Sequence, residues 1–278
     1  MLQKLIKIIV CIFPLMKWTI LLFLISSYHI QAQIPTDNSI SLSCDSFYGV
    51  DDFMSIYYST DNVLYKKSES KRLEFFDIQL GDITSVDIIN PLKILVFYRD
   101  TQTLVFLDNR LNEQQRLNFN ILKPQRFIEH VRLAGERRLW LYNLDLSRLE
   151  LYDYTNNKLV NSTTPIKEPV IEMQSDYNFC HLITEKGIIT YNTYASETSR
   201  INEELKLPVA FDFEQLGFQT DSGWKWYRFD KEFRFRESEI TTSFSQEYSP
   251  ESLYLKGGKL YLYHQKRLHV QTINLKKS

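Results

Sequence analysis

The histidines and the paired acids are the residues of this sequence that could do chemistry. Past residue 32 there are four histidines, and only His264 and His269 are close together, on either side of a Gln-Lys pair typical of a turn. Two side chains five residues apart do not lie on the same face of a helix or of a strand. Metal ligands must converge on one point. We therefore predict no metal site there and expect both histidines at a surface or sheet edge.

Adjacent acids occur at Asp51 and Asp52. A general acid and a general base must face one substrate, but neighbouring strand residues point to opposite sides, so we interpret the pair as part of a turn. The sequence also lacks the nucleophile elbow of serine hydrolases, phosphate-binding loops and dinucleotide fingerprints. It thus predicts no catalytic residue and no cofactor.

Aromatic side chains are the remaining candidates for binding. Trp224, Trp226 and Tyr227 are close together in one strand-like run, and Trp140 stands in another run where rings and charges alternate. Because the faces of Trp and Tyr stack on sugars and bases, these four residues are a candidate binding surface. The alternative, which we favour, is that the rings pack between neighbouring sheets.

Six places along the chain combine a β-rich run with a following turn. The three clearest place Asp108, Asp153 and Asp230 after such a run, and weaker copies follow at Tyr65, Tyr191 and Gln271. The copies are 38 to 45 residues apart with no helical phase, which is the length of a four-stranded propeller blade. We predict an all-β fold, a single β-propeller of about six four-stranded blades, with five to seven compatible with the pattern and a β-sandwich pair as the rival fold.

The clearest blade predicts strands at 83–89, 94–98, 103–107 and 114–119. Its inner strands are apolar and its last strand is polar, as expected when an outermost strand must resist pairing with other chains. The Asp before each fourth strand is expected to cap its turn. Residues 38–44 are expected to supply the missing outer strand of the last blade, and 195–206 is the one stretch whose spacing could suit a helix.

The first 32 residues are typical of a secretory signal peptide, with two apolar runs and a small residue before the expected cleavage site at residue 33. Translation that starts at Met16 would still give a complete signal peptide. The alternative is a transmembrane anchor, but the second run is shorter than the roughly 20 apolar residues of a span. We expect residues 33–278 to form the propeller, with no membrane span after cleavage. Cys44 and Cys180 could form a disulfide in an oxidising compartment, but separate buried thiols are the expectation.

The formal net charge of −1 gives no basic field, so we expect no nucleic-acid partner. The stretch 82–113, through its "NPLK" and "LDNRLNE" elements, resembles a group of uncharacterised, exported β-propeller-like proteins of the Bacteroidota. The resemblance implies a cell-envelope protein and brings no catalytic residue with it. The blades lack the Gly-His and Trp-Asp pairs of WD-type propellers.

Together these features favour a non-enzymatic, exported scaffold in the periplasm or at the outer membrane. We expect it to bind an envelope protein partner as an accessory subunit of an outer-membrane-associated complex. Two alternatives stay open, a carbohydrate- or peptidoglycan-binding module and a propeller hydrolase or lactonase. The hydrolase would need carboxylates that converge at one mouth of the channel, whereas the sequence shows them scattered.

Overall fold

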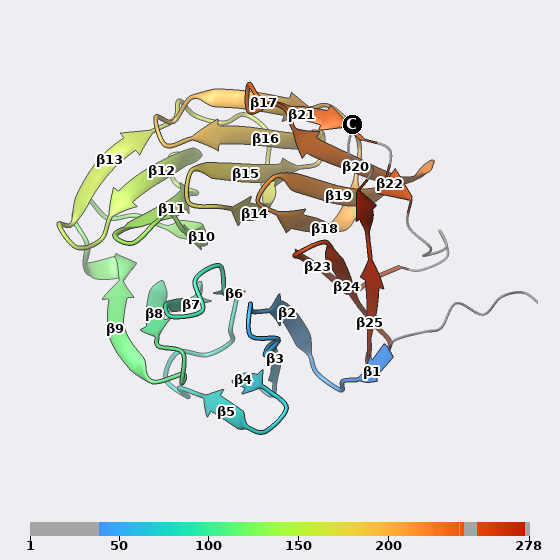
Figure 1. The fold of residues 1–278 in the computed structure, drawn as a ribbon. Helices are drawn as coiled ribbons and strands as arrows, with labels where there is room; N and C mark the ends of the chain where they lie inside the picture. Colours follow the sequence, from blue (N-terminus) through green and yellow to red (C-terminus); the bar gives the residue numbers. More distant parts are fainter. Residues whose placement is uncertain (1–38, 239, 242–248, 276–278) are drawn as a thin grey trace, which may run out of the picture. The chain divides into compact units, whose positions relative to one another are not determined.

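The computed structural model describes residues 39–238, 240–241 and 249–275, which belong to one compact unit of the chain. The predicted signal peptide, residues 1–32, and the alternative start at Met16 lie outside the described residues. Six four-stranded antiparallel sheets surround a common centre (Figure 1). The protein is therefore a six-bladed β-propeller, as the repeat predicted, and the β-sandwich alternative is wrong.

The blades are numbered here in chain order. Blade 1 contains β2 (Ser46–Val50), β3 (Ile56–Thr60), β4 (Val63–Lys67) and β5 (Arg72–Phe75). Blade 2 contains β6 (Ser85–Asp87), β7 (Ile94–Tyr98), β8 (Thr103–Leu107) and β9 (Glu113–Asn118), followed by a 3-10 turn, η1 (Phe119–Ile121). Blade 3 contains β10 (Ile128–Leu133), β11 (Arg138–Asn143), β12 (Arg148–Asp153) and β13 (Lys158–Ser162).

Blade 4 contains β14 (Val170–Ser175), β15 (Phe179–Thr184), β16 (Gly187–Asn192) and β17 (Glu197–Ile201). Blade 5 contains β18 (Lys206–Asp212), β19 (Gln215–Thr220), β20 (Gly223–Phe229) and β21 (Phe235–Glu237). Blade 6 contains β23 (Ser252–Lys256), β24 (Lys259–His264), β25 (Arg267–Thr272) and β1 (Ser39–Ser41). A separate pair is formed by β22 (Ile240–Thr241) and β26 (Asn274–Leu275).

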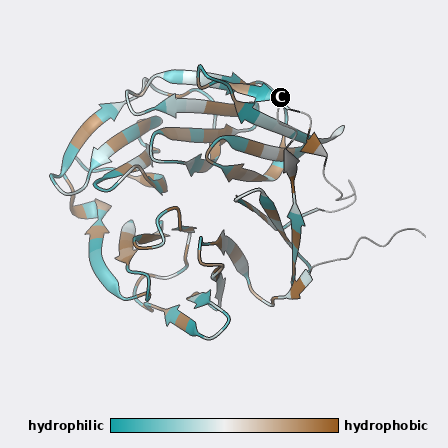
Figure 2. Ribbon diagram, in the orientation of Figure 1, coloured by the Kyte–Doolittle hydropathy of each residue, from teal (hydrophilic) through white to brown (hydrophobic). Residues whose placement is uncertain are grey.

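Burial follows the order of the strands within a blade. In blade 2 every side chain of β7 and β8 is buried, because both faces of these strands pack against neighbouring blades, whereas the first four residues of β9 are exposed. Figure 2 shows the same change from hydrophobic middle strands to a hydrophilic outer strand. The four strands predicted for this blade are confirmed, with ends that differ by one or two residues.

The ring closes through the N-terminal strand. β1 pairs antiparallel with β25, Ser39 opposite His269 and Ser41 opposite Arg267. The Tyr263 hydroxyl also donates to the carbonyl oxygen of Cys44 over 2.9 Å. The expectation that residues 38–44 complete the last blade is thus confirmed, so the two ends of the propeller are tied within one sheet.

Two sequence expectations need correction. The candidate helix at 195–206 is wrong, because Glu197–Ile201 is the outer strand β17, with Ser199 and Ile201 buried alternately as a strand requires, and β18 starts at Lys206. His269 is buried instead of lying at an edge, since β1 pairs with β25 and makes it an inner strand of the blade. The turn between His264 and Arg267 is confirmed.

The two cysteines of the described chain are separate thiols. Cys180 packs in the core between blades 3 and 4, whereas Cys44 lies in the cluster around Tyr263, and burial raises the pKa of both. The expectation of unpaired thiols is confirmed. No helix of membrane-spanning length and hydrophobicity occurs in the part of the chain that the structure describes.

Candidate functional site

The centre of the ring is a channel lined by the first strand of each blade. β2, β6, β10, β14, β18 and β23 surround it (Figure 1) and enclose a cavity of about 320 Å³. Ligand sites in propellers and barrels favour such central openings, where several elements contribute side chains. The channel is therefore the place to look for function.

The direction of the strands puts a defined set of turns at one end of this channel. In a four-stranded antiparallel sheet, the first and third strands run the same way and finish at the same end. We call this end of the ring the mouth end. The turns after the first strands and the turns that hold Asp108, Asp153 and Asp230 all lie there.

An aspartate stands at or directly after the last residue of the first strand in four blades, at Asp51, Asp87, Asp176 and Asp212. The spacing between consecutive aspartates of this set is close to one or two blade lengths. The sequence reasoning missed three of them because it compared the turns before the fourth strands. A search for acids that recur after the first strand of each blade would have found them.

Two of these aspartates join neighbouring blades. Asp87 accepts the backbone N–H of Ile89 through Oδ1 over 3.0 Å and that of Leu133, in blade 3, through Oδ2 over 2.7 Å. Asp212 of blade 5 accepts the N–H of Gly257, in blade 6, over 2.9 Å. Part of the role of these carboxylates is therefore to hold adjacent blades in register.

Asp176 and Asp212 are incompletely satisfied. Oδ1 of Asp176 accepts the N–H groups of Asn178 and Phe179 over 2.6 and 2.7 Å, and no described residue donates to its Oδ2. Asp212 likewise uses only Oδ2. Burial raises the pKa of both carboxyl groups in spite of these hydrogen bonds, and at Asp212 in spite of the nearby charge of Lys256 as well.

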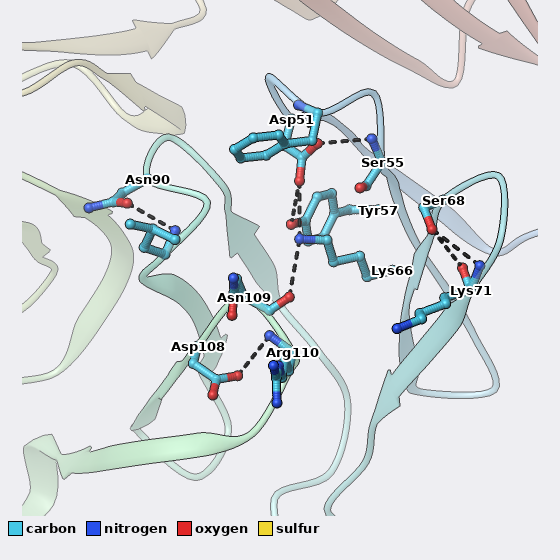
Figure 3. A network of polar contacts seen from close by, with 12 residues as sticks. Asp51, Ser55, Tyr57, Lys66, Ser68, Lys71, Asn90, Asp108, Asn109 and Arg110 are labelled. Carbon is cyan, nitrogen blue, oxygen red and sulfur yellow. Dashed lines mark hydrogen bonds and ion pairs between the residues drawn. The ribbon is translucent and has the colours of Figure 1, made fainter.

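Asp51 differs because it has its own cation. Figure 3 shows its carboxylate beside Lys66 Nζ, 3.1 Å from Oδ2, and the Tyr57 hydroxyl, 3.0 Å from Oδ2, while Ser55 N–H donates to Oδ1. Burial acts to raise the pKa of Asp51, but the backbone, Lys66 and Tyr57 together hold it below its ordinary value. Lys66 also donates to the carbonyl oxygen of Asn109 in blade 2. The predicted turn at Asp51 and Asp52 is confirmed, and Asp51 belongs to a buried network between blades.

Deeper in the channel lie Glu172, Gln174 and Arg132. Gln174 donates to Glu172 Oε1, and burial raises the pKa of Glu172. Arg132 donates from Nε to the carbonyl oxygen of Met173 over 2.8 Å. Arg132 is therefore a cation that lies near Glu172 in the channel but forms no ion pair with it in the described chain.

Tyr254 of β23 lines the channel. Its ring lies so close to the backbone of Gly49 that a Cβ added there would be 2.5 Å from Tyr254 Cε2, and Gly49 has a φ of +139°. Burial, followed by the nearby carboxylates of Asp87 and Asp212, raises the pKa of Tyr254. Tyr254 is half-buried, and its hydroxyl makes no hydrogen bond to any residue described here.

An apolar rim surrounds part of the mouth end. We define the apolar rim as Phe53, Met54 and Phe213, which are 74%, 57% and 42% exposed. Lys256 Nζ lies 5.7 Å from the centre of the Phe213 ring and 2.9 Å from Asp52 Oδ1, next to Phe53. The rim therefore continues across blades 5, 6 and 1.

The backbone makes two residues of the rim unusual. Met54 and Phe213 have φ values of +61° and +42°, in the left-handed region where Gly and Asn are favoured and bulky side chains are uncommon. An exposed apolar side chain in this conformation stabilises the fold neither by burial nor by backbone preference. Phe233, which is 54% exposed with a φ of +58°, shows the same combination in a turn of blade 5.

Most of the rings that the sequence offered as a candidate binding surface lie in the interior. Trp140, Trp226 and Tyr227 are buried, and Trp226 lies so close to Gly217 that any added Cβ there would overlap its ring. Trp224 is half-buried and stacks on Trp226 with ring centres 6.1 Å apart. The blades use these large rings to fill the space between strands and neighbouring sheets, which is the packing interpretation.

The aspartates before the fourth strands are turn caps. Asp108 accepts the N–H of Arg110 over 2.8 Å and that of Asn112 over 2.9 Å (Figure 3), and Asp153 and Asp230 bind the backbone of their own turns in the same way. Their predicted structural role is confirmed. Within 39–238, 240–241 and 249–275, no three side chains of His, Cys, Asp or Glu come close enough together to ligate a metal ion.

Comparison with known proteins gives the fold. No protein-family model matches the chain, and no curated protein is significantly similar to it in sequence. A chain of the mitotic checkpoint complex is similar in structure with a TM-score of 0.57 and 10% identity, over 84% of this chain and 75% of that one. The β-propeller domain of Cps50 (Swd1) from Myceliophteria thermophila gives a TM-score of 0.57 and 9% identity, over 85% and 99%.

Virginiamycin B lyase from Staphylococcus aureus is also similar, with a TM-score of 0.53 and 10% identity, over 85% of this chain and 98% of that one. The similar structures thus include both an enzyme and a member of a protein complex. At such low identity the likeness establishes a β-propeller and does not select a function.

Proposed function

We propose that this protein is an exported cell-envelope β-propeller that binds a protein partner, as a scaffold or accessory subunit of an outer-membrane-associated complex. The sequence of residues 1–32 and the resemblance to exported propeller-like proteins support the envelope location. A propeller fold shared with a chain of a protein complex supports the binding role.

The apolar rim is the observation that carries this proposal. Exposed apolar groups that gather on one face are typical of protein interaction sites. Burying one side chain of the size of Phe or Met contributes about 1.5–3 kcal/mol, so the rim could supply much of the binding free energy of a partner.

The catalytic alternative has less support from the geometry. Aspartates of four blades do stand at the ends of their first strands, at the mouth end, a recurrence that the sequence analysis missed. However, Asp87 uses both of its oxygens on backbone N–H groups, and Asp51 is held by Lys66. A carbohydrate-binding role finds little support either, because three of the four candidate rings are buried.

Co-purification from the source cells tests the proposal. We expect the tagged full chain to recover a stoichiometric partner from detergent-solubilised envelopes, and the double variant Phe53→Asp, Phe213→Asp to lose it. The matched control is Ile121→Asp, because Ile121 is 76% exposed but lies in η1, at the opposite end of the ring. Recovery of no partner, or equal recovery by the rim variant, would contradict the proposal.

A further inference from the structure

We propose that the mouth of the channel receives a cationic side chain of the partner, a Lys or Arg flanked by apolar residues that cover the apolar rim. This inference rests on the proposed function and specifies the chemistry of the bound segment. The channel supplies carboxylates for the cation and the rim supplies contacts for its neighbours.

Charge is the first argument. The residues that line the cavity include five acids and two bases, the acids being Asp87, Glu172, Asp176, Asp212 and Glu251 and the bases Arg132 and Lys256. Both bases are engaged, Arg132 with a backbone carbonyl oxygen and Lys256 with Asp52. The cavity therefore has an excess of negative charge that a cation from outside would neutralise.

Unused hydrogen-bonding capacity is the second argument. Tyr254 lines the cavity and is half-buried, and its hydroxyl makes no hydrogen bond within the described chain. Asp176 is only 7% exposed, yet its Oδ2 also has no donor. A buried carboxylate oxygen without a donor costs free energy, and an ammonium or guanidinium group in the cavity would supply a donor to Asp176 Oδ2 or to Asp212 Oδ1.

The size and position of the cavity are the third argument. A volume of about 320 Å³ is near the lower limit for ligand pockets, which suits one long side chain rather than a folded element. Phe213 belongs both to the cavity wall and to the apolar rim. A segment with a cation between two apolar residues would therefore reach both regions at once.

Calorimetry with two synthetic peptides tests this inference. The first is acetyl-Gly-Leu-Phe-Lys-Leu-Gly-amide, and the second has norleucine in place of Lys, which keeps the apolar chain and removes the charge. Titrated into protein purified after expression of the full chain, the Lys peptide should bind at least tenfold more tightly, and the difference should shrink as salt is added. Equal binding of both peptides, or binding of neither, would overturn the inference.

Variants of the channel locate the effect. We expect Asp176→Asn and Asp212→Asn each to weaken the Lys peptide about tenfold, as removal of one charged partner does, and to leave the norleucine peptide unchanged. Asp153→Asn is the matched control, because Asp153 is a turn cap at the same end of the ring but does not line the cavity. An equal effect of the control and the channel variants would also overturn the inference.

The same variants separate this inference from the proposed function. If Phe53→Asp, Phe213→Asp loses the native partner while Asp176→Asn and Asp212→Asn together retain it, the cation site is wrong and the scaffold role stands. If no partner is recovered in any experiment, the scaffold role fails, whatever the peptides show.

Discussion

A buried histidine in blade 4 should make the stability of this protein depend on pH. His181 of β15 is completely buried, its Nδ1 lies 3.0 Å from Thr190 Oγ1, and its Nε2 has no partner in the described chain. The rings of Phe211 and Phe235 lie 4.4 and 5.4 Å from it. Burial lowers the pKa of His181 from 6.5 to about 3, because the surroundings offer nothing to stabilise a positive charge.

The direction of the effect follows from comparing the two states. As the pH falls below 6.5, the unfolded chain takes up a proton at this histidine and the folded chain does not. The contribution to stability is therefore complete above pH 6.5 and is lost progressively down to about pH 3. Between the two pKa values, each pH unit changes the free energy of unfolding by about 1.4 kcal/mol. Through His181 alone, this free energy should therefore fall by about 2 kcal/mol between pH 6.5 and pH 5.0.

Other groups titrate in the same range, so the test is a difference between two proteins. His130, whose pKa burial lowers to about 4, acts in the same direction, whereas Glu172, Asp176 and Asp212 have raised pKa values and act in the opposite direction. The variant His181→Asn removes one titrating group and keeps a side-chain amide that can reach Thr190.

Urea unfolding at pH 7.5 and pH 5.0 measures the difference. We expect His181→Asn to be about 1–2 kcal/mol less stable at pH 7.5, because it leaves a small cavity, and to lose about 2 kcal/mol less than the original protein on going to pH 5.0. Equal losses in the two proteins would show that His181 is not held neutral in the folded state, which would refute the reasoning.

Three further predictions follow from the fold. Met54→Gly and Phe213→Asn should leave thermal stability unchanged or raise it by up to about 1 kcal/mol, since each relieves a left-handed backbone, and a fall of more than that in a melting experiment would contradict this account of the rim. Lys66→Met should lower the free energy of unfolding by about 3–5 kcal/mol by leaving Asp51 without its cation, and adding Asp51→Asn should restore part of it in the same denaturation assay. Removing residues 33–41 takes away the three residue pairs of β1 with β25 and should lower Tm by about 6–12 °C, whereas removing 33–37 should not, as scanning calorimetry would show.

The sequence by itself determined the architecture of the ring. A blade is a local unit, so its strand order, its turn caps and the change from apolar to polar strands all appear within about 40 consecutive residues. Asp108 and the strands around it were predictable for this reason. The closing strand was also predictable, because the last copy lacked an outer strand and residues 38–44 had a suitable pattern.

Only the tertiary structure decided which side chains meet. Asp176, Asp212 and Tyr254 come from different blades, and the closure of the ring brings them to one cavity, which no local pattern records. The same holds for His269, which became buried because a strand from the other end of the chain pairs with β25. Contacts between first strands depend on how six sheets close around an axis, and this arrangement is set by packing between blades rather than by the residues of any one of them.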